Sequence, residues 1–171
     1  KKYIYIQSDL NAWYELALRL NQKNIAEPVL WFGDDSKTKL VKKKFSCETL
    51  AFYDQYKIGS ETFVVNELAN SFFLSDRYNY VKDICIKMMD REDISGLVRY
   101  IDREAIFYYW LLWASHKIQK LKPDFLLMSE SPHAYLHYLV YELCEFASIK
   151  TLSFGMVTKF APILYLRNGI Y

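Results

Sequence analysis

The sequence predicts an α/β fold: a Rossmann-like three-layer sandwich with a mostly parallel sheet and long helices on both faces. Near each end of the chain, an apolar segment, an amphipathic helix and a second apolar segment follow one another with short connections. Such a strand–helix–strand unit favours two parallel strands joined by a right-handed crossover. The sequence between the two units is typical of long helices, and this alternation of elements is characteristic of layered α/β domains.

The first unit begins at residues 3–7 (YIYIQ), which we expect to form a strand. Ser8 or Asp9 is predicted to cap the following helix, because their side-chain oxygens can accept from free N–H groups in its first turn. Residues 29–32 (VLWF) are expected to form the second strand, which ends at Gly33. The apolar face predicted for the helix between them consists of Leu10, Trp13, Leu16, Ala17 and Leu20.

The middle of the chain is predicted to be mainly helical. The basic stretch 37–44 is interpreted as a solvated loop or short helix, and residues 49–53 as a strand. One helix is expected from Ser75 or Asp76 to about residue 89. A longer helix is expected from about Ser95 or Asp102 to residue 121, and its aromatic centre at 107–113 is typical of a helix packed between two layers.

The last unit carries the strongest functional indication. Residues 125–128 (FLLM) form an unbroken apolar run suited to a strand covered on both faces. Ser131 followed by Pro132 is predicted to start a helix, and residues 151–154 are predicted to form the next strand. Ligands of open parallel sheets bind beyond the carboxyl ends of the strands. The polar residues expected at that edge are Ser129, Glu130, Ser131 and His133.

Composition limits the classes of protein to consider. A chain of 171 residues suits one domain, so we expect residues 1–171 to form a single Rossmann-like domain. A net charge of +2 gives no electrostatic reason to propose nucleic acid as a partner. The three cysteines show neither a disulfide pattern nor a zinc pattern, which favours a cytoplasmic location. The longest uncharged run, residues 105–115, is too short to cross a bilayer, so no transmembrane segment is predicted.

Several common sites are excluded by their missing motifs. No glycine follows the first strand, where a dinucleotide-binding fingerprint requires glycines so that the backbone can approach a pyrophosphate. The chain also lacks the GxxxxGK[ST] phosphate-binding loop and the GxSxG nucleophile elbow. His133 and His137 have the spacing of zinc ligands on a helix, and Glu130 could be a third ligand. The glutamate that usually follows the first histidine is absent, so we expect no metal site.

Glu130 and its neighbours instead favour a ligand rich in hydroxyl groups. A carboxylate at this edge repels phosphate but accepts hydrogen bonds from hydroxyl groups. His133, expected at the second helical position, could stay neutral beside the positive end of the helix and accept a proton. Ser129 and Ser131 add neutral donors and acceptors. The alternative interpretation is that Glu130 and Ser131 only satisfy the free N–H groups of the helix, and it stays open at this point.

The run from Lys122 to Gly155, KPDFLLMSESPHAYLHYLVYELCEFASIKTLSFG, resembles the amino-terminal domain of bacterial surface and capsular polysaccharide biosynthesis proteins with a GT-B glycosyltransferase-like architecture. The resemblance covers about a fifth of the chain. It implies a two-domain protein in which this chain is the acceptor-side half. A missing carboxyl-terminal domain would hold the donor, a nucleotide-activated sugar, so we expect no cofactor in this chain and no transferase activity from it alone.

The resemblance also implies roles for individual residues. Glu130 or His133 would take the proton of the acceptor hydroxyl, with Asp9 as the reserve candidate. The residues expected to contact the carbohydrate acceptor are Ser129, Ser131, Asp9, Ser8 and Asn11. The expected location is the cytoplasm, with peripheral association at the inner face of the membrane left open. Two alternatives remain: a stand-alone Rossmann-like binding or scaffold domain, and a small metal-dependent hydrolase that uses Glu130, His133 and His137.

Overall fold

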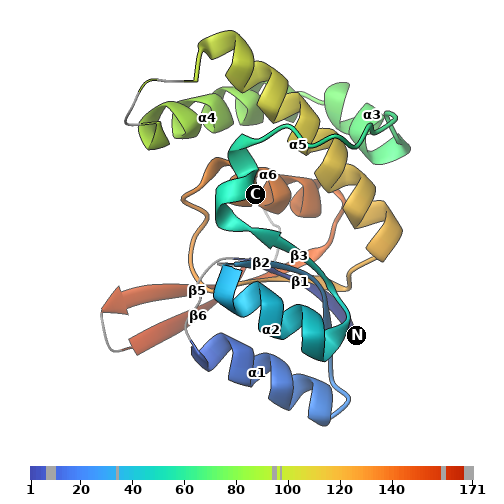
Figure 1. The fold of residues 1–171 in the computed structure, drawn as a ribbon, viewed down its shortest axis with the longest axis vertical. Coiled ribbons are helices and arrows are strands. Elements are labelled where there is room, and N and C mark those ends of the chain that lie inside the picture. Colours follow the sequence, from blue (N-terminus) through green and yellow to red (C-terminus); the bar gives the residue numbers. More distant parts are fainter. Residues whose placement is uncertain (7–10, 34, 94–95, 97, 159–160, 168–171) are drawn as a thin grey trace. The chain divides into compact units, whose positions relative to one another are not determined.

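The computed structural model describes residues 1–6, 11–33, 35–93, 96, 98–158 and 161–167 (Figure 1). The chain divides into two compact units. The first, here called the sheet unit, comprises Lys1–Asp54, Leu121–Ser131 and Ser148–Tyr171. The second, called the helical unit, comprises Gln55–Lys120 and Pro132–Ala147. The prediction that residues 1–171 form a single domain stays a prediction.

The sheet unit is built on one six-stranded sheet with the order β3-β2-β1-β4-β5-β6. The first five strands in that order are parallel, and only β6 runs antiparallel to its neighbour β5. This topology confirms the predicted Rossmann-like α/β class with a mostly parallel sheet. The strands are β1 (Lys2–Ile6), β2 (Glu27–Gly33), β3 (Glu48–Ala51), β4 (Phe125–Met128), β5 (Lys150–Thr158) and β6 (Ala161–Arg167).

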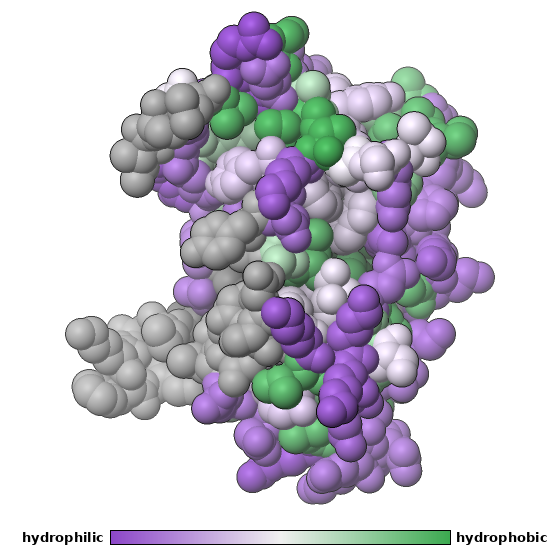
Figure 2. Space-filling model, in the orientation of Figure 1, coloured by the Kyte–Doolittle hydropathy of each residue, from purple (hydrophilic) through white to green (hydrophobic). Residues whose placement is uncertain are grey.

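Two helices connect the first three strands. Helix α1 (Asn11–Gln22) joins β1 to β2, and α2 (Asp35–Phe45) joins β2 to β3, on the same side of the sheet (Figure 1). The basic stretch 37–44 is therefore a helix, in which Val41 is buried and the lysines that follow it stay exposed. Figure 2 shows mostly hydrophilic side chains over this helix.

The core of the sheet unit lies beneath these two helices. Its most tightly stacked pair is Tyr5 and Trp31, whose ring centroids are 3.9 Å apart, and Trp13 of α1 packs on Tyr5 at 5.9 Å. Both strand residues are almost fully buried. The buried members of this cluster are Tyr3, Tyr5, Ala17, Ala26, Trp31, Val41, Cys47 and Leu127. The aromatic richness of the sequence thus serves packing between strands and helices on this face.

The helices end in an unusual way for a chain with so few glycines. Four residues that follow helices have a φ angle between 49° and 58°: Asn24 after α1, Ser46 after α2, Lys122 after α5 (Tyr100–Leu121) and Ser148 after α6 (Tyr135–Phe146). This left-handed conformation lets the chain leave a helix and enter a strand, and glycine normally adopts it at least cost. The sequence has only 5 glycines, so three of these turns use serine or lysine at a steric cost.

The helical unit contains the remaining helices. They are α3 (Glu67–Phe73), α4 (Arg77–Glu92), α5 (Tyr100–Leu121) and α6 (Tyr135–Phe146), and a short 3-10 turn (Phe52–Tyr56) precedes them. The two long helices predicted from the sequence, α4 and α5, are confirmed. Helix α3 was not predicted, although the Asn66 side chain caps it by accepting from the Ala69 N–H at 2.9 Å.

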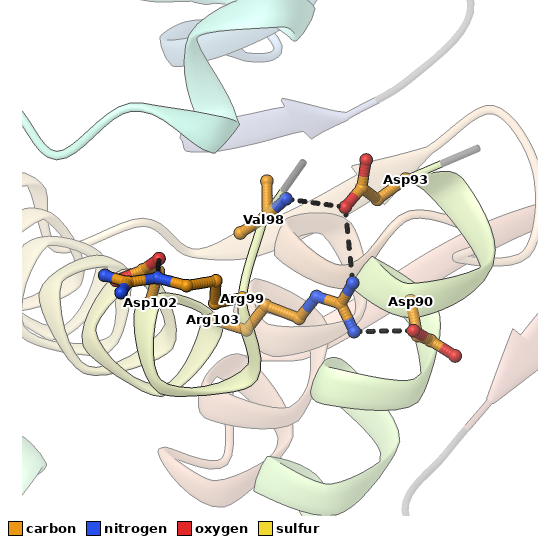
Figure 3. Close-up of polar contacts among 6 residues, drawn as sticks. All are labelled: Asp90, Asp93, Val98, Arg99, Asp102 and Arg103. Atoms are coloured by element: carbon orange, nitrogen blue, oxygen red, sulfur yellow. Dashed lines mark hydrogen bonds and ion pairs between the residues drawn. The ribbon is translucent and has the colours of Figure 1, made fainter. Parts of the chain in front are cut away.

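Ion pairs of Arg103 join the end of α4 to the start of α5 (Figure 3). The guanidinium of Arg103, only 10% exposed, contacts Asp90 at 2.5 Å and Asp93 at 3.2 Å. Asp93 also accepts a hydrogen bond from the Val98 N–H at 2.8 Å, which fixes the connection between the two helices. A neighbouring pair, Arg99 and Asp102, is exposed to solvent.

The prediction that α6 begins at Ser131 and Pro132 is wrong. The helix begins at Tyr135, and its N-cap residue is Ala134, which has an extended backbone and no capping side chain. Residues 131–133 are not helical, so Ser131 and Pro132 lie outside the helix. The Arg91 side chain donates a hydrogen bond to the backbone carbonyl of His133 at 2.5 Å. This contact holds the segment that precedes the first turn of α6.

Among the described residues, no helix is long and apolar enough to cross a membrane.

Candidate functional site at the carboxyl edge of the sheet

The order of the strands reverses between β1 and β4. From β1, the chain adds β2 and β3 on one side and later β4 and β5 on the other. Ile6 and Met128, the last residues of β1 and β4, are register partners at this point. In open parallel sheets, the crevice beyond such a reversal is where ligands bind, because the connections on its two sides leave in opposite directions.

Ser129 fixes the geometry of this edge. Its backbone N–H donates to the carbonyl of Ile6 at 3.2 Å, and the residue is only 4% exposed. The first residue after β4 is therefore anchored to the end of β1. Glu130 follows and is half-buried, and Ser131 is exposed. Three consecutive polar residues thus leave the sheet at the reversal point, as predicted.

Residues after β1 contribute to the same edge. Asn11 is the first residue of α1, and it is exposed. Because α1 leads away from the carboxyl end of β1, its first turn lies at the edge that Ser129 also occupies. Ser8 and Asp9, which were predicted to bind the acceptor, lie outside the described residues.

The start of α6 at Tyr135 changes the interpretation of Glu130 and Ser131. The N-cap position belongs to Ala134, which has no side chain that could cap the helix. Neither Ser131 nor Glu130 therefore occupies the N-cap position that was predicted for Ser131.

His133 lies in the helical unit and is exposed. It precedes the N-cap of α6, so its predicted place at the second helical position is wrong. His133 and His137 do not lie on successive turns of one helix, and their ring centroids are 6.2 Å apart. His137 is 3% exposed, and burial, together with the charge of His133, lowers the pKa of His137 to about 3. His137 is thus a neutral core imidazole.

Two other kinds of chemistry find no support in the described residues. Within the described ranges, no group of three or more His, Cys, Asp or Glu side chains is placed to hold a metal ion. The alternative of a hydrolase using Glu130, His133 and His137 therefore lacks a metal centre there.

All three cysteines are buried free thiols, and burial raises the pKa of Cys47 to about 11. The protonated thiol is a poor nucleophile, so cysteine catalysis is disfavoured.

The sequence did not reveal a polar cluster in the helical unit. Tyr56 donates a hydrogen bond to Glu92, and the Tyr135 hydroxyl donates to the carbonyl of Gln55. Burial raises the pKa of Glu92, while the bond from Tyr56 opposes that shift. The partners are 36 and 80 residues apart in the chain, and no motif links residues at such spacing.

Comparisons with family models, with curated proteins and with solved structures gave no match for this chain. The chemistry of the sheet edge is therefore the basis for a functional assignment. Its described residues are the buried Ser129, the half-buried Glu130 and the exposed Ser131 and Asn11, which carry hydroxyl, carboxylate and amide groups. Such a set exchanges hydrogen bonds with a neutral polar ligand and supplies no positive charge for a phosphate.

Proposed function

We propose that the edge formed by Ser129, Glu130, Ser131 and Asn11 binds a carbohydrate acceptor. The observation that carries this proposal is the hydrogen bond from Ser129 to Ile6, which anchors these polar residues at the reversal point of the sheet. Sugars present hydroxyl groups that both donate and accept, and the serine, amide and carboxylate groups complement them. A glycine-free, carboxylate-bearing edge suits this ligand better than a nucleotide phosphate.

On this proposal the chain is the acceptor-side domain of a glycosyltransferase-like protein in bacterial surface or capsular polysaccharide biosynthesis. Glu130 is the proposed general base: its carboxylate takes the proton from an acceptor hydroxyl as that oxygen forms a bond to the anomeric carbon of the donor sugar. The bond from that carbon to the nucleotide phosphate breaks, and the nucleotide leaves with the electron pair. A second domain would hold the nucleotide-sugar donor.

His133 stays the alternative base. It is exposed, and an imidazole can accept a proton near neutral pH. Glu130 is preferred because it directly follows the anchored Ser129 within the sheet unit, whereas His133 belongs to the helical unit. A cytoplasmic location, with peripheral association at the inner face of the membrane, is part of the same proposal.

A matched pair of variants tests the binding site. In calorimetric titrations with a panel of neutral oligosaccharides, we expect Glu130→Gln to weaken binding by about tenfold or more, because an ionised acceptor makes stronger hydrogen bonds than an amide. Glu15→Gln, which changes an exposed carboxylate on α1, should bind like the wild type. Both variants should keep the wild-type melting temperature. Equal affinities for all three proteins, or no binding at all, would contradict the proposal.

Activity gives a separate test. The 171-residue chain supplies only the proposed acceptor side, so it should show no sugar transfer from nucleotide-activated donors. Turnover by this chain alone would show that the donor is bound within residues 1–171, and the assignment as one half of a two-domain protein would then be wrong.

A stand-alone binding or scaffold domain is the second candidate function. The observation that favours it is an open apolar groove on the sheet unit, which lies beside α1 along β4 and β5.

A further inference from the structure

Helix α2 and the turn after it concentrate positive charge. Residues 36–47 contain five lysines and no acidic residue. The whole chain has a net charge of only +2, so the rest of the chain is net negative. Positive charge is therefore gathered on one helix of the sheet unit.

The apolar side of α2 fixes which of its side chains reach solvent. Thr38 and Val41 are buried, and the half-buried Phe45 contacts Tyr14 of α1, with 6.4 Å between the ring centroids. These α2 positions are three and four residues apart, so they share one side of the helix. The opposite side, here called the lysine face, consists of the exposed residues Lys39, Leu40, Lys42, Lys43 and Lys44, and Figure 2 shows mostly hydrophilic side chains over this helix.

The stability of α2 does not account for all of these lysines. The negative end of the helix dipole favours lysine in the last turn, but Lys39 precedes that turn. Lys39 also lies three and four residues before Lys42 and Lys43, a spacing at which like charges repel and destabilise a helix. The ion pairs found among the described residues involve none of the lysines of this face. An anionic partner would relieve their repulsion.

The composition of the lysine face favours a membrane surface as that partner. Residues 36–47 contain no arginine, the side chain whose planar fork recognises phosphates in a fixed geometry, and lysine acts instead as a point charge. A cluster of four or more lysines on an amphipathic helix is typical of binding to anionic lipid headgroups. Leu40 lies among the lysines and is 47% exposed. A leucine side chain is stabilised where it enters the boundary between headgroups and acyl chains.

We propose that the lysine face of α2 binds the surface of a membrane rich in anionic phospholipids. Its lysines contact the headgroups, and Leu40 enters the boundary with the acyl chains. The inference assigns residues to the peripheral association named in the proposed function, and it rests on that function only for the choice of the inner face of the membrane. The attraction needs no carbohydrate, so it is tested separately from the carboxyl edge of the sheet.

Flotation of the full chain with two kinds of vesicle tests the proposal. We expect binding to phosphatidylcholine vesicles that contain about 30% phosphatidylglycerol, no binding to phosphatidylcholine alone, and a loss of affinity as salt is added. Lys39→Gln/Lys43→Gln should weaken the binding by about tenfold or more, because each lysine near an anionic surface contributes to it. The control Lys87→Gln/Lys120→Gln, which removes two exposed lysines of the helical unit, should bind like the wild type.

Leu40→Ser distinguishes a membrane from a soluble polyanion. It should weaken binding to the anionic vesicles several-fold and leave any binding to duplex DNA unchanged, because only the bilayer has an apolar region that receives the leucine. Since all the substituted side chains are exposed, every variant should keep the wild-type melting temperature.

The proposal is wrong if the chain does not bind anionic vesicles, if both pairs of lysine variants bind equally, or if Leu40→Ser binds like the wild type. It is also wrong if duplex DNA binds as tightly as the vesicles at the same ionic strength, because the partner would then be a nucleic acid. The vesicle assay contains no sugar, and the oligosaccharide titration of Glu130→Gln contains no lipid. Failure of one proposal is therefore distinguishable from failure of the other.

Discussion

The backbone N–H of Ser129 donates to the carbonyl of Ile6 at 3.2 Å, so the segment that follows β4 is anchored to the end of β1. This contact joins two strands that are separated by more than a hundred residues and lie side by side at the reversal point of the sheet. It places Glu130 and Ser131 where open α/β sheets bind their ligands. The predictions below test the fold that supports this edge, and the last measurement tests the edge itself.

Replacing Ser46 with glycine should stabilise the protein. Ser46 has a φ of 52° between α2 and β3, a conformation that costs a residue with a Cβ about 1 kcal/mol. Ser46→Gly removes that strain, and the expected gain is about 0.5–1 kcal/mol after the entropy lost by glycine. Urea denaturation measures it. Ser60→Gly, in an exposed segment with an ordinary φ, should give no gain, and a loss of stability in Ser46→Gly would contradict the explanation.

The two arginines near the start of α5 should differ in importance. Arg103 is 10% exposed and contacts Asp90 and Asp93, whereas Arg99 is 78% exposed and contacts Asp102 (Figure 3). Arg103→Met should lower the melting temperature by several degrees, because it leaves the nearly buried carboxylate of Asp93 without its ion pair. Arg99→Met should have an effect near the error of the measurement, since exposed pairs contribute little. Equal effects in thermal denaturation would contradict this difference.

His137 should make stability depend on pH. In the folded protein burial keeps its imidazole neutral down to a pH of about 3, whereas the unfolded chain takes up the proton near the ordinary pKa of 6.5. The contribution of neutral His137 is therefore fully present above pH 6.5 and is lost as the pH falls toward 3. From pH 7 to pH 5 the wild type should lose about 2 kcal/mol more than His137→Asn. Denaturant titrations at both pH values measure this difference, and parallel losses would contradict it.

The Tyr135 hydroxyl should stabilise the helical unit. It is buried at the first position of α6 and donates to the carbonyl of Gln55, a residue that is 1% exposed. Tyr135→Phe removes only this donor and should cost about 1 kcal/mol, because the buried carbonyl loses its partner. Tyr100→Phe, at a position that is 59% exposed, should cost almost nothing in the same denaturation experiment. If Tyr135→Phe leaves the free energy of unfolding unchanged, the hydrogen bond makes no net contribution to stability.

Most of the sheet could be predicted because its strands are short apolar runs. Residues 125–128 agree with β4 at both ends, and the other predicted strands differ from the observed bounds by a few residues. Strand β6 was not predicted, because nothing in the sequence indicates that its apolar segment pairs with β5. The left-handed turns at Ser46, Lys122 and Ser148 explain part of the remaining error, since glycine does not mark the ends of these helices.

The candidate site was predicted less completely than the fold. Residues 129–131 follow directly from the end of an apolar strand, so their place at the carboxyl edge could be predicted. The start of α6 could not, because a serine followed by proline has the composition of a helix start. The backbone of His133 instead contacts Arg91, which is 42 residues away in the chain. Contacts of this range decide which of several plausible start positions a helix adopts.

Backbone NMR of the isotope-labelled 171-residue chain, titrated with a neutral oligosaccharide, is the most direct test of the carbohydrate site. We expect the largest shift changes at the amides of Asn11, Ser129, Glu130 and Ser131, with saturation of all four at one affinity. The same titration of Glu130→Gln should require about tenfold more ligand. Shift changes that avoid these amides and follow the apolar groove or the helical unit would contradict the proposed function.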